Sequence, residues 1–193
     1  FSLPSILSQP LPEIPPIAGL EVGKGYLSGD IRVDRPMDFS TKNRVSLRDL
    51  QKGLCKLVRP EVDCGDDGAF GLSAVDRALL LQSMGQFPRE SANPVYPPAD
   101  YPDAYAKYLL PGLEKIAPGR FRIYNKIGQA YGFTTENAWI EDTRTGRGFF
   151  LTATIYTNAD GILNDDQYEY KTVALPFYSA LGEALGQWFL SAP

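Results

Sequence analysis

Residues 120–158 constrain the fold most, because they have the pattern of three consecutive antiparallel strands. Residues 121–127 alternate large apolar and polar side chains, as a strand with one buried face does. Residues 137–142 form the second predicted strand, which ends in a turn at 143–146. Residues 148–157 are aromatic and β-branched almost throughout, which predicts a strand buried on both faces.

Two amphipathic segments with capping signals predict helices before these strands. Ser46 and Asp49 have the spacing of a capping box, and leucines at helical spacing follow until Pro60. A similar segment begins at Ser73 and ends before Pro88. We expect the apolar stripes of both helices to lie in the core rather than to bind a cofactor.

Two further helices are predicted, one on each side of the strands. The first covers residues 103–116 and is kinked or shortened by Pro111, because proline lacks the N–H that a helix interior needs. The second covers residues 172–190, and small residues between its large ones suit close packing on a sheet. One face of this helix carries Phe177, Leu181, Leu185 and Trp188, and we expect the helix to dock on the sheet.

The order of these elements predicts an α+β fold, with an antiparallel three-stranded meander packed against a long C-terminal helix. Residues 1–44 are expected to be a Pro- and Gly-rich arm and connector, and residues 45–118 a small helical lobe. Residues 119–193 contain the strands and the last helix, and we expect them to form one domain together with the helical lobe. A chain of 193 residues is long enough to bury such a core.

The charge and residue usage exclude several classes of function. The net charge is −4 with no long basic run, so nucleic acid is not an expected partner. No apolar run approaches the roughly 18 residues of a membrane span. The chain contains no histidine, which excludes a Ser-His-Asp or Cys-His mechanism within it and argues against zinc.

Two features leave alternatives open. Cys55 and Cys64 form either a small disulfide loop in an exported protein or two reduced, partly buried thiols, and their spacing does not decide between these. Residues 158–170 are dense in Asn and Asp, which suits either a calcium loop or ordinary turns. They do not match the EF-hand pattern, so no metal site is assigned.

From about Asp34 to its end, the chain resembles the C-terminal half of the serine β-lactamase-like, penicillin-recognising hydrolases, especially divergent class A-like members. PMDFSTKNRVSLRDLQKGL at 36–54 is similar to the connector and capped helix after the family's omega-loop region. NKIGQAYGF at 125–133 resembles the Lys-Thr/Ser-Gly strand beside the active site. Residues 148–170 and the helix after them resemble the final strand and terminal helix.

The resemblance implies roles for four consecutive residues. Lys126 would be the basic residue of the Lys-Thr-Gly motif, an auxiliary catalytic group that supports the nucleophile electrostatically and attracts a substrate carboxylate. Gly128 would keep the strand edge clear for the substrate, and the Gln129 backbone would line that edge. Ile127 stands where the family has a Thr or Ser hydroxyl that binds the carboxylate. The alternative for Lys126 is an exposed charge at a strand end.

The chain also departs from the family pattern. It contains neither Ser-x-x-Lys, where the family carries its nucleophile, nor Ser-Asp-Asn, and the acid of the omega loop has no clear counterpart. We therefore expect no hydrolysis from this chain alone. It is expected to be the C-terminal portion of a longer bacterial hydrolase, exported to the periplasm or the cell exterior or anchored as a lipoprotein.

Such a hydrolase would act by acyl transfer on a small-molecule or peptide-like amide or ester, without a cofactor. The alternative is a catalytically inactive, lactamase-like binding or interaction module. In the family, N-terminal strands and a helix complete the sheet, so this portion alone would expose apolar surface and could form a homodimer.

Overall fold

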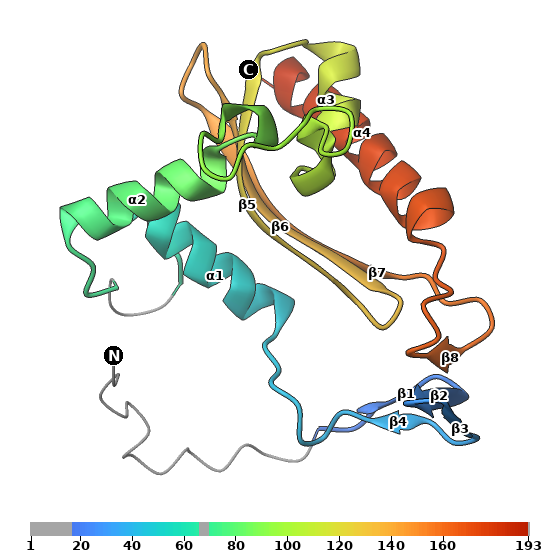
Figure 1. Cartoon of the computed structure of the whole chain (residues 1–193). Coiled ribbons are helices and arrows are strands. Elements are labelled where there is room, and N and C mark those ends of the chain that lie inside the picture. The colour runs from blue at the N-terminus through green and yellow to red at the C-terminus, as the bar shows by residue number, and fades with distance from the viewer. Residues whose placement is uncertain (1–16, 66–69, 193) are drawn as a thin grey trace.

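The computed structural model describes residues 17–65 and 70–192, and its centre is an antiparallel sheet with helices on both faces (Figure 1). The sheet contains β5 (Phe121–Ala130), β6 (Phe133–Asp142) and β7 (Gly148–Tyr156) in the order β5-β6-β7. The predicted α+β class and the antiparallel meander are thus confirmed.

The first two strands run further than their sequence pattern indicated. Ala130 pairs with Phe133, so only Tyr131 and Gly132 form the turn between β5 and β6. Both turn residues have positive φ, 54° and 84°, as a two-residue turn that matches strand twist requires. Tyrosine is unusual in such a turn, and its ring lies edge-on against Phe39 at a centroid distance of 5.1 Å.

The central, buried strand is β6 and not β7, so the prediction that residues 148–157 are buried on both faces was wrong. No residue of β7 is fully buried, whereas seven of the ten β6 residues are. Among the described residues β7 pairs only with β6, which leaves it at an edge of the sheet. The aromatic and β-branched residues of β7 are nevertheless typical of a strand that other elements bury more fully than the described part of the chain does.

One face of the sheet is covered by α3 (Leu110–Ile116) and α4 (Leu175–Ser191), as Figure 1 shows. The docking of the last helix on the sheet is confirmed: the Tyr178 hydroxyl donates to the carbonyls of Thr134 and Ala153, at 2.8 and 2.9 Å. A five-residue π-helical turn, Tyr170–Ala174, leads into α4.

The buried side of α4 includes two of the small residues that the sequence indicates for close packing, Gly182 and Gly186. Phe177 and Trp188 are 40% and 62% exposed, and the buried positions are Tyr178, Gly182, Gly186 and Phe189. The small residues select this side, because a helix face with glycines can approach another backbone more closely than a face of large side chains.

Glycines form the crossing between α3 and α4. A Cβ atom on Gly112 would lie 1.8 Å from the Ser179 carbonyl oxygen, and one on Gly182 would lie 2.3 Å from that of Leu109. The two helix backbones therefore touch, and neither position accepts a larger residue without movement of the helices.

The other face of the sheet is covered by α1 (Leu47–Val58) and α2 (Ala74–Gly85). Both predicted caps are present, since the hydroxyls of Ser46 and Ser73 accept N–H groups from Asp49 and Asp76. In α1, Leu54 and Val58 pack on Trp139 of β6. The expectation that both apolar stripes are buried was wrong for α2.

The predicted helix 103–116 is divided into two pieces. Asp103–Ala106 forms one 3-10 turn, and α3 begins only at Leu110, with Pro111 in its first turn. Lys107 lies between the two pieces and is buried. A further 3-10 turn, Pro88–Glu90, follows α2.

The segment predicted as an arm and connector contains two small sheets in its described part. One pairs β1 (Glu21–Val22) with β4 (Met37–Asp38). The other contains β2 (Gly25–Ser28), β3 (Ile31–Val33) and β8 (Ile162–Leu163), and β8 joins β2 in parallel. The pairing of β8 with β2 ties this segment to the loop after β7.

Cys55 and Cys64 form a disulfide, with their Cα atoms 5.9 Å apart, which decides between the two alternatives left by the sequence. The bridge holds the segment after α1 against that helix. Within the described ranges, no helix is long and apolar enough to cross a membrane.

Candidate functional site

The outer side of β5 is one of the two edges of the main sheet, opposite the β7 edge, since within the described residues β5 pairs only with β6. It is called the free edge below. Next to the first strand pair, the Thr143 amide donates to the Arg120 carbonyl at 3.0 Å. Because bonded and non-bonded pairs alternate in an antiparallel ladder, the even-numbered residues of β5 bond to β6. The backbone N–H and C=O groups of Asn125, Ile127 and Gln129 are therefore directed toward the free edge.

The structure places the four predicted site residues together at the end of β5, but on two faces. Lys126 and Gly128 lie on the α1 side of the sheet, and Ile127 and Gln129 lie on the α4 side. The Lys126 side chain is exposed, and its ammonium donates to the Ile127 carbonyl at 2.7 Å. A Cβ on Gly128 would meet only Thr135 at 3.9 Å, so the strand is open to an approaching molecule there.

A pocket of about 700 Å³ opens beside this edge on the α4 side. The side chains of Ile127 and Gln129 form one wall, the turn at 104–108 a second, and the segment 166–175 a third. Tyrosines dominate the lining, namely Tyr105, Tyr108, Tyr168 and Tyr170. Lys126 does not line this pocket, so the site residues separate into an edge group and a pocket group.

Hydrogen bonds fix two of these tyrosines. The Tyr170 hydroxyl accepts the Gly132 amide of the β5–β6 turn at 2.8 Å. The Tyr168 hydroxyl accepts the Asn164 amide at 2.7 Å, and the two rings contact each other at a centroid distance of 5.1 Å. The tyrosine wall is thus held in place before any ligand arrives.

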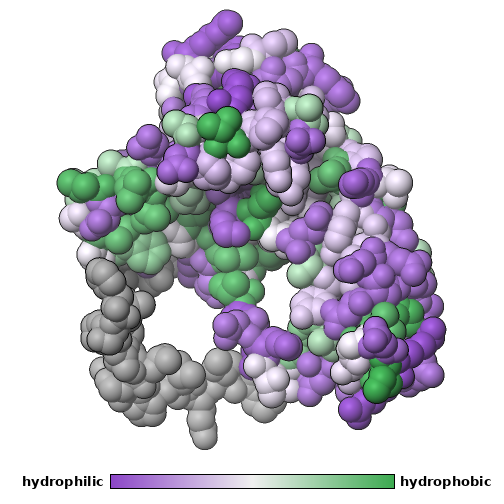
Figure 2. Space-filling view, in the orientation of Figure 1, coloured by the Kyte–Doolittle hydropathy of each residue, from purple (hydrophilic) through white to green (hydrophobic). Residues whose placement is uncertain are grey.

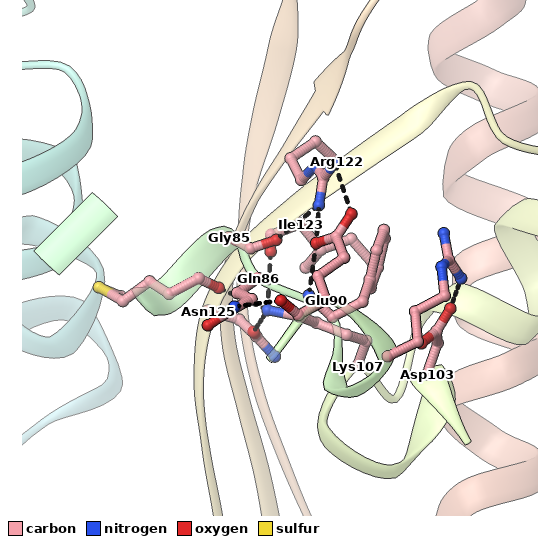
Figure 3. A network of polar contacts seen from close by, with 11 residues as sticks. Gly85, Gln86, Glu90, Asp103, Lys107, Arg122, Ile123 and Asn125 are labelled. Atoms are coloured by element: carbon pink, nitrogen blue, oxygen red, sulfur yellow. Dashed lines mark hydrogen bonds and ion pairs between the residues drawn. The ribbon is translucent and has the colours of Figure 1, made fainter. Parts of the chain in front are cut away.

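A buried polar network lies behind the pocket (Figure 3). The Lys107 ammonium donates to the Asn125 side-chain oxygen at 2.6 Å and to the Ile123 carbonyl at 2.9 Å. The Asn125 amide nitrogen donates to Glu136 at 2.6 Å, and the Tyr108 backbone amide donates to the other Glu136 oxygen at 3.1 Å. Asn125 therefore links the cation to the carboxylate.

Burial dominates the protonation of this network. It raises the pKa of Glu136 to about 7, against the opposing effect of the hydrogen bonds from Asn125 and the Tyr108 amide and of the Lys107 charge. It also lowers the pKa of Lys107 to about 8. Tyr108, which lines the pocket, has its pKa raised to about 12 by burial and by Glu136.

Sequence reasoning missed this network entirely. Lys107 precedes the apolar residues 108–110, and Glu136 interrupts a strand pattern, and both look like surface charges in a sequence. No sequence signal could have found it, because Glu136 lies just before the predicted strand 137–142 and only the observed register places it opposite Ile127, on the buried face.

A second polar group braces the other end of β5. Arg122 donates to both oxygens of Glu90, at 2.7 and 3.2 Å, and to the Gly85 carbonyl at 3.0 Å (Figure 3). This interaction lowers the pKa of Glu90. Arg89 pairs with Asp103 nearby. These contacts hold the segment after α2 on the sheet.

An exposed apolar surface covers α2 and the residues just before it, and Figure 2 shows it as a green area over that helix. Val75 and Leu79 are 78% and 61% exposed, although Leu79 belongs to the stripe that the sequence predicts to be buried. Phe70, Leu72 and Leu80 extend the same surface. Single exposed apolar residues are common, but a cluster of this kind marks an interaction surface.

The Asn- and Asp-rich residues 158–170 act as turn formers. The side-chain oxygens of Asn158, Asp160 and Asp165 accept backbone amides two or three residues further along. In the described part of the chain, no three His, Cys, Asp or Glu side chains are grouped so that they could hold a metal ion.

Comparison of the chain with protein families, with curated proteins and with solved structures finds no match.

Proposed function

We propose that this chain is the C-terminal part of a β-lactamase-like serine hydrolase that transfers the acyl group of an amide or ester substrate. One observation carries the proposal: the free edge of β5 combines the exposed Lys126 ammonium with the outward backbone groups of Ile127 and Gln129. The nucleophilic serine would lie in a Ser-x-x-Lys sequence outside this chain.

In this mechanism the substrate carbonyl lies at the β5 edge. The serine oxygen attacks the carbonyl carbon, its proton passes to the neighbouring lysine of Ser-x-x-Lys, and the amine or alcohol leaves with a proton. Water then hydrolyses the seryl ester. The outward N–H of Gln129 is oriented to donate to the developing oxyanion, and the Lys126 charge stabilises the same negative charge.

The surfaces of the described chain fit an incomplete domain. β7 has the composition of a covered strand but lies at an edge, and α2 carries exposed apolar residues. Additional strands beside β7 and helices over α2 would cover both, as the N-terminal half of a β-lactamase-like hydrolase would. The Cys55–Cys64 disulfide supports the related proposal that the protein is exported, since such bonds persist in oxidising compartments.

The second candidate is a catalytically inactive binding module of the same origin. Ile127 favours it, because an isoleucine cannot give the hydrogen bond to a carboxylate that the family's hydroxyl gives. In this case the exposed surface of α2 would contact a partner protein or a second copy of the chain.

The two candidates are separated by acylation kinetics of the full-length protein with a fluorescent penicillin and with an activated ester. Lys126→Ala is expected to slow acylation by roughly 100-fold, as removal of one group that stabilises the oxyanion typically does.

Lys115→Ala is the matched control, because Lys115 is an exposed lysine on α3, on the other face of the sheet. It should acylate at the wild-type rate. Acylation of Lys126→Ala at the full rate would remove Lys126 from the mechanism, and a protein that no probe acylates would favour the binding module.

A further inference from the structure

We propose that the tyrosine-lined pocket beside β5 binds an aromatic ring of the ligand that occupies the strand edge. Its role as a substrate subsite rests on the function proposed above, whereas the binding of the ring does not. The ligand class is therefore an aromatic amide or ester, such as an arylacetyl compound or a peptide with an aromatic side chain.

The first argument is the chemistry of the walls. Four tyrosines surround a volume of about 700 Å³, together with the apolar Ile127 and Leu175. Pockets of this size and lining are typical sites for small organic ligands. Aromatic side chains interact favourably with another ring in stacked or edge-on arrangements. This interaction adds to the free energy gained when the apolar surface of the ligand ring is buried.

The second argument is charge. Lys171 and Asp166 both line the pocket, and they carry opposite signs. Neither an anion nor a cation is favoured by both groups, so an uncharged ring is the ligand that these walls suit best. Gln129 and Thr172 can give hydrogen bonds to polar atoms attached to the ring.

The third argument is the connection between pocket and edge. Ile127 and Gln129 line the pocket with their side chains and direct their backbone N–H groups to the free edge. An extended ligand that pairs with this edge places alternate substituents on the same face as Ile127. The substituent on that face is directed into the tyrosine pocket.

The fourth argument is rigidity. Tyr168 and Tyr170 are held by backbone amides, and the Tyr108 ring lies 5.7 Å from that of Tyr178 behind it. A site that is formed in advance loses little conformational entropy when the ligand binds.

Calorimetric titration of the full-length protein with phenylacetamide tests this proposal, with cyclohexylacetamide as the ligand of matched shape without a π system. We expect phenylacetamide to bind about two- to tenfold more tightly than the saturated compound. Thr172→Trp, a change of an exposed residue that fills the pocket, should abolish binding of both compounds.

Tyr105→Ala should weaken phenylacetamide binding several-fold and is expected to fold, because Tyr105 is largely exposed. Tyr96→Ala is its control, since Tyr96 packs on Tyr101 outside the pocket. Equal affinity for the two compounds, or unchanged binding in Thr172→Trp, would overturn the proposal. Lys126→Ala should leave phenylacetamide binding intact while slowing acylation, so the failure of this pocket and the failure of the hydrolase mechanism are distinguishable.

Discussion

At the scale of single residues, the least expected feature is a carboxylate held in the core. Glu136 is fully buried, yet its two oxygens accept hydrogen bonds from the Asn125 side chain and the Tyr108 amide. Lys107 is buried beside it and donates to three oxygens, those of Met84, Ile123 and Asn125. These bonds fix the turn at 104–108 on β5 and thereby one wall of the tyrosine pocket.

The raised pKa of Glu136 predicts a pH dependence of stability. The folded protein holds this proton up to about pH 7, whereas the unfolded chain releases it near pH 4.5. Between these values the native state binds more protons, so the free energy of unfolding should fall as pH rises from about 4.5 to 7. Lys107, whose pKa is about 8, remains charged through most of this range.

Urea denaturation at a series of pH values below 7.5 checks this prediction. Glu136→Gln should flatten the slope, because the neutral amide does not titrate. The control Glu183→Gln, which removes a surface partner of Lys115, should keep the wild-type slope. An unchanged slope in Glu136→Gln would show that this carboxyl does not titrate in the range.

The contacts of individual side chains are also what the sequence predicted least well. The positions of Lys126 and Ile127 on one strand could be predicted from local alternation, whereas Gly128 and Gln129 lie beyond the predicted end of that strand. The association of Lys107 with Asn125 and Glu136 depends on contacts that join residues 107, 125 and 136. No local pattern contains that information.

At the scale of elements, the contact between α3 and α4 depends on glycine. Gly112→Ala would place a methyl group against the Ser179 carbonyl, so the helices would have to separate. We expect a loss of roughly 1 to 3 kcal/mol in the free energy of unfolding, as overpacked cores usually show.

The opposite effect is expected for Gly53→Ala. Gly53 lies in the middle of α1, and a Cβ atom added there would have its nearest neighbour, a ring carbon of Phe70, at 3.9 Å. There the substitution should stabilise the protein by roughly 0.5 to 1 kcal/mol, since alanine favours the helix. Chemical denaturation of both variants measures the difference. Equal effects of the two substitutions would contradict the close crossing of α3 and α4.

The elements themselves were largely predictable, and their buried faces were not. Helix caps at Ser46 and Ser73 and the alternation in β5 are local signals, and the structure contains them. In α4, close packing buries Gly182 and Gly186 and leaves the large Phe177 and Trp188 exposed. The large stripe of α2 is exposed because nothing in the described chain covers it.

At the scale of the whole molecule, the described chain packs helices on both faces of its sheet and still leaves three features exposed. These are the outer face of α2, the β7 edge and the Lys126 side of β5. In the hydrolase that we propose, a further part of the protein would pack over all three features. That part would bring the nucleophile to the face where Lys126 lies.

Mass-spectrometric mapping of the acyl group tests this account most directly. The full-length protein is incubated with an activated ester or a penicillin, digested, and searched for the acylated residue. The account predicts one serine within Ser-x-x-Lys, outside the 193 residues of this chain. An adduct on a residue within this chain, or no adduct at a rate above that of the unfolded protein, would contradict it.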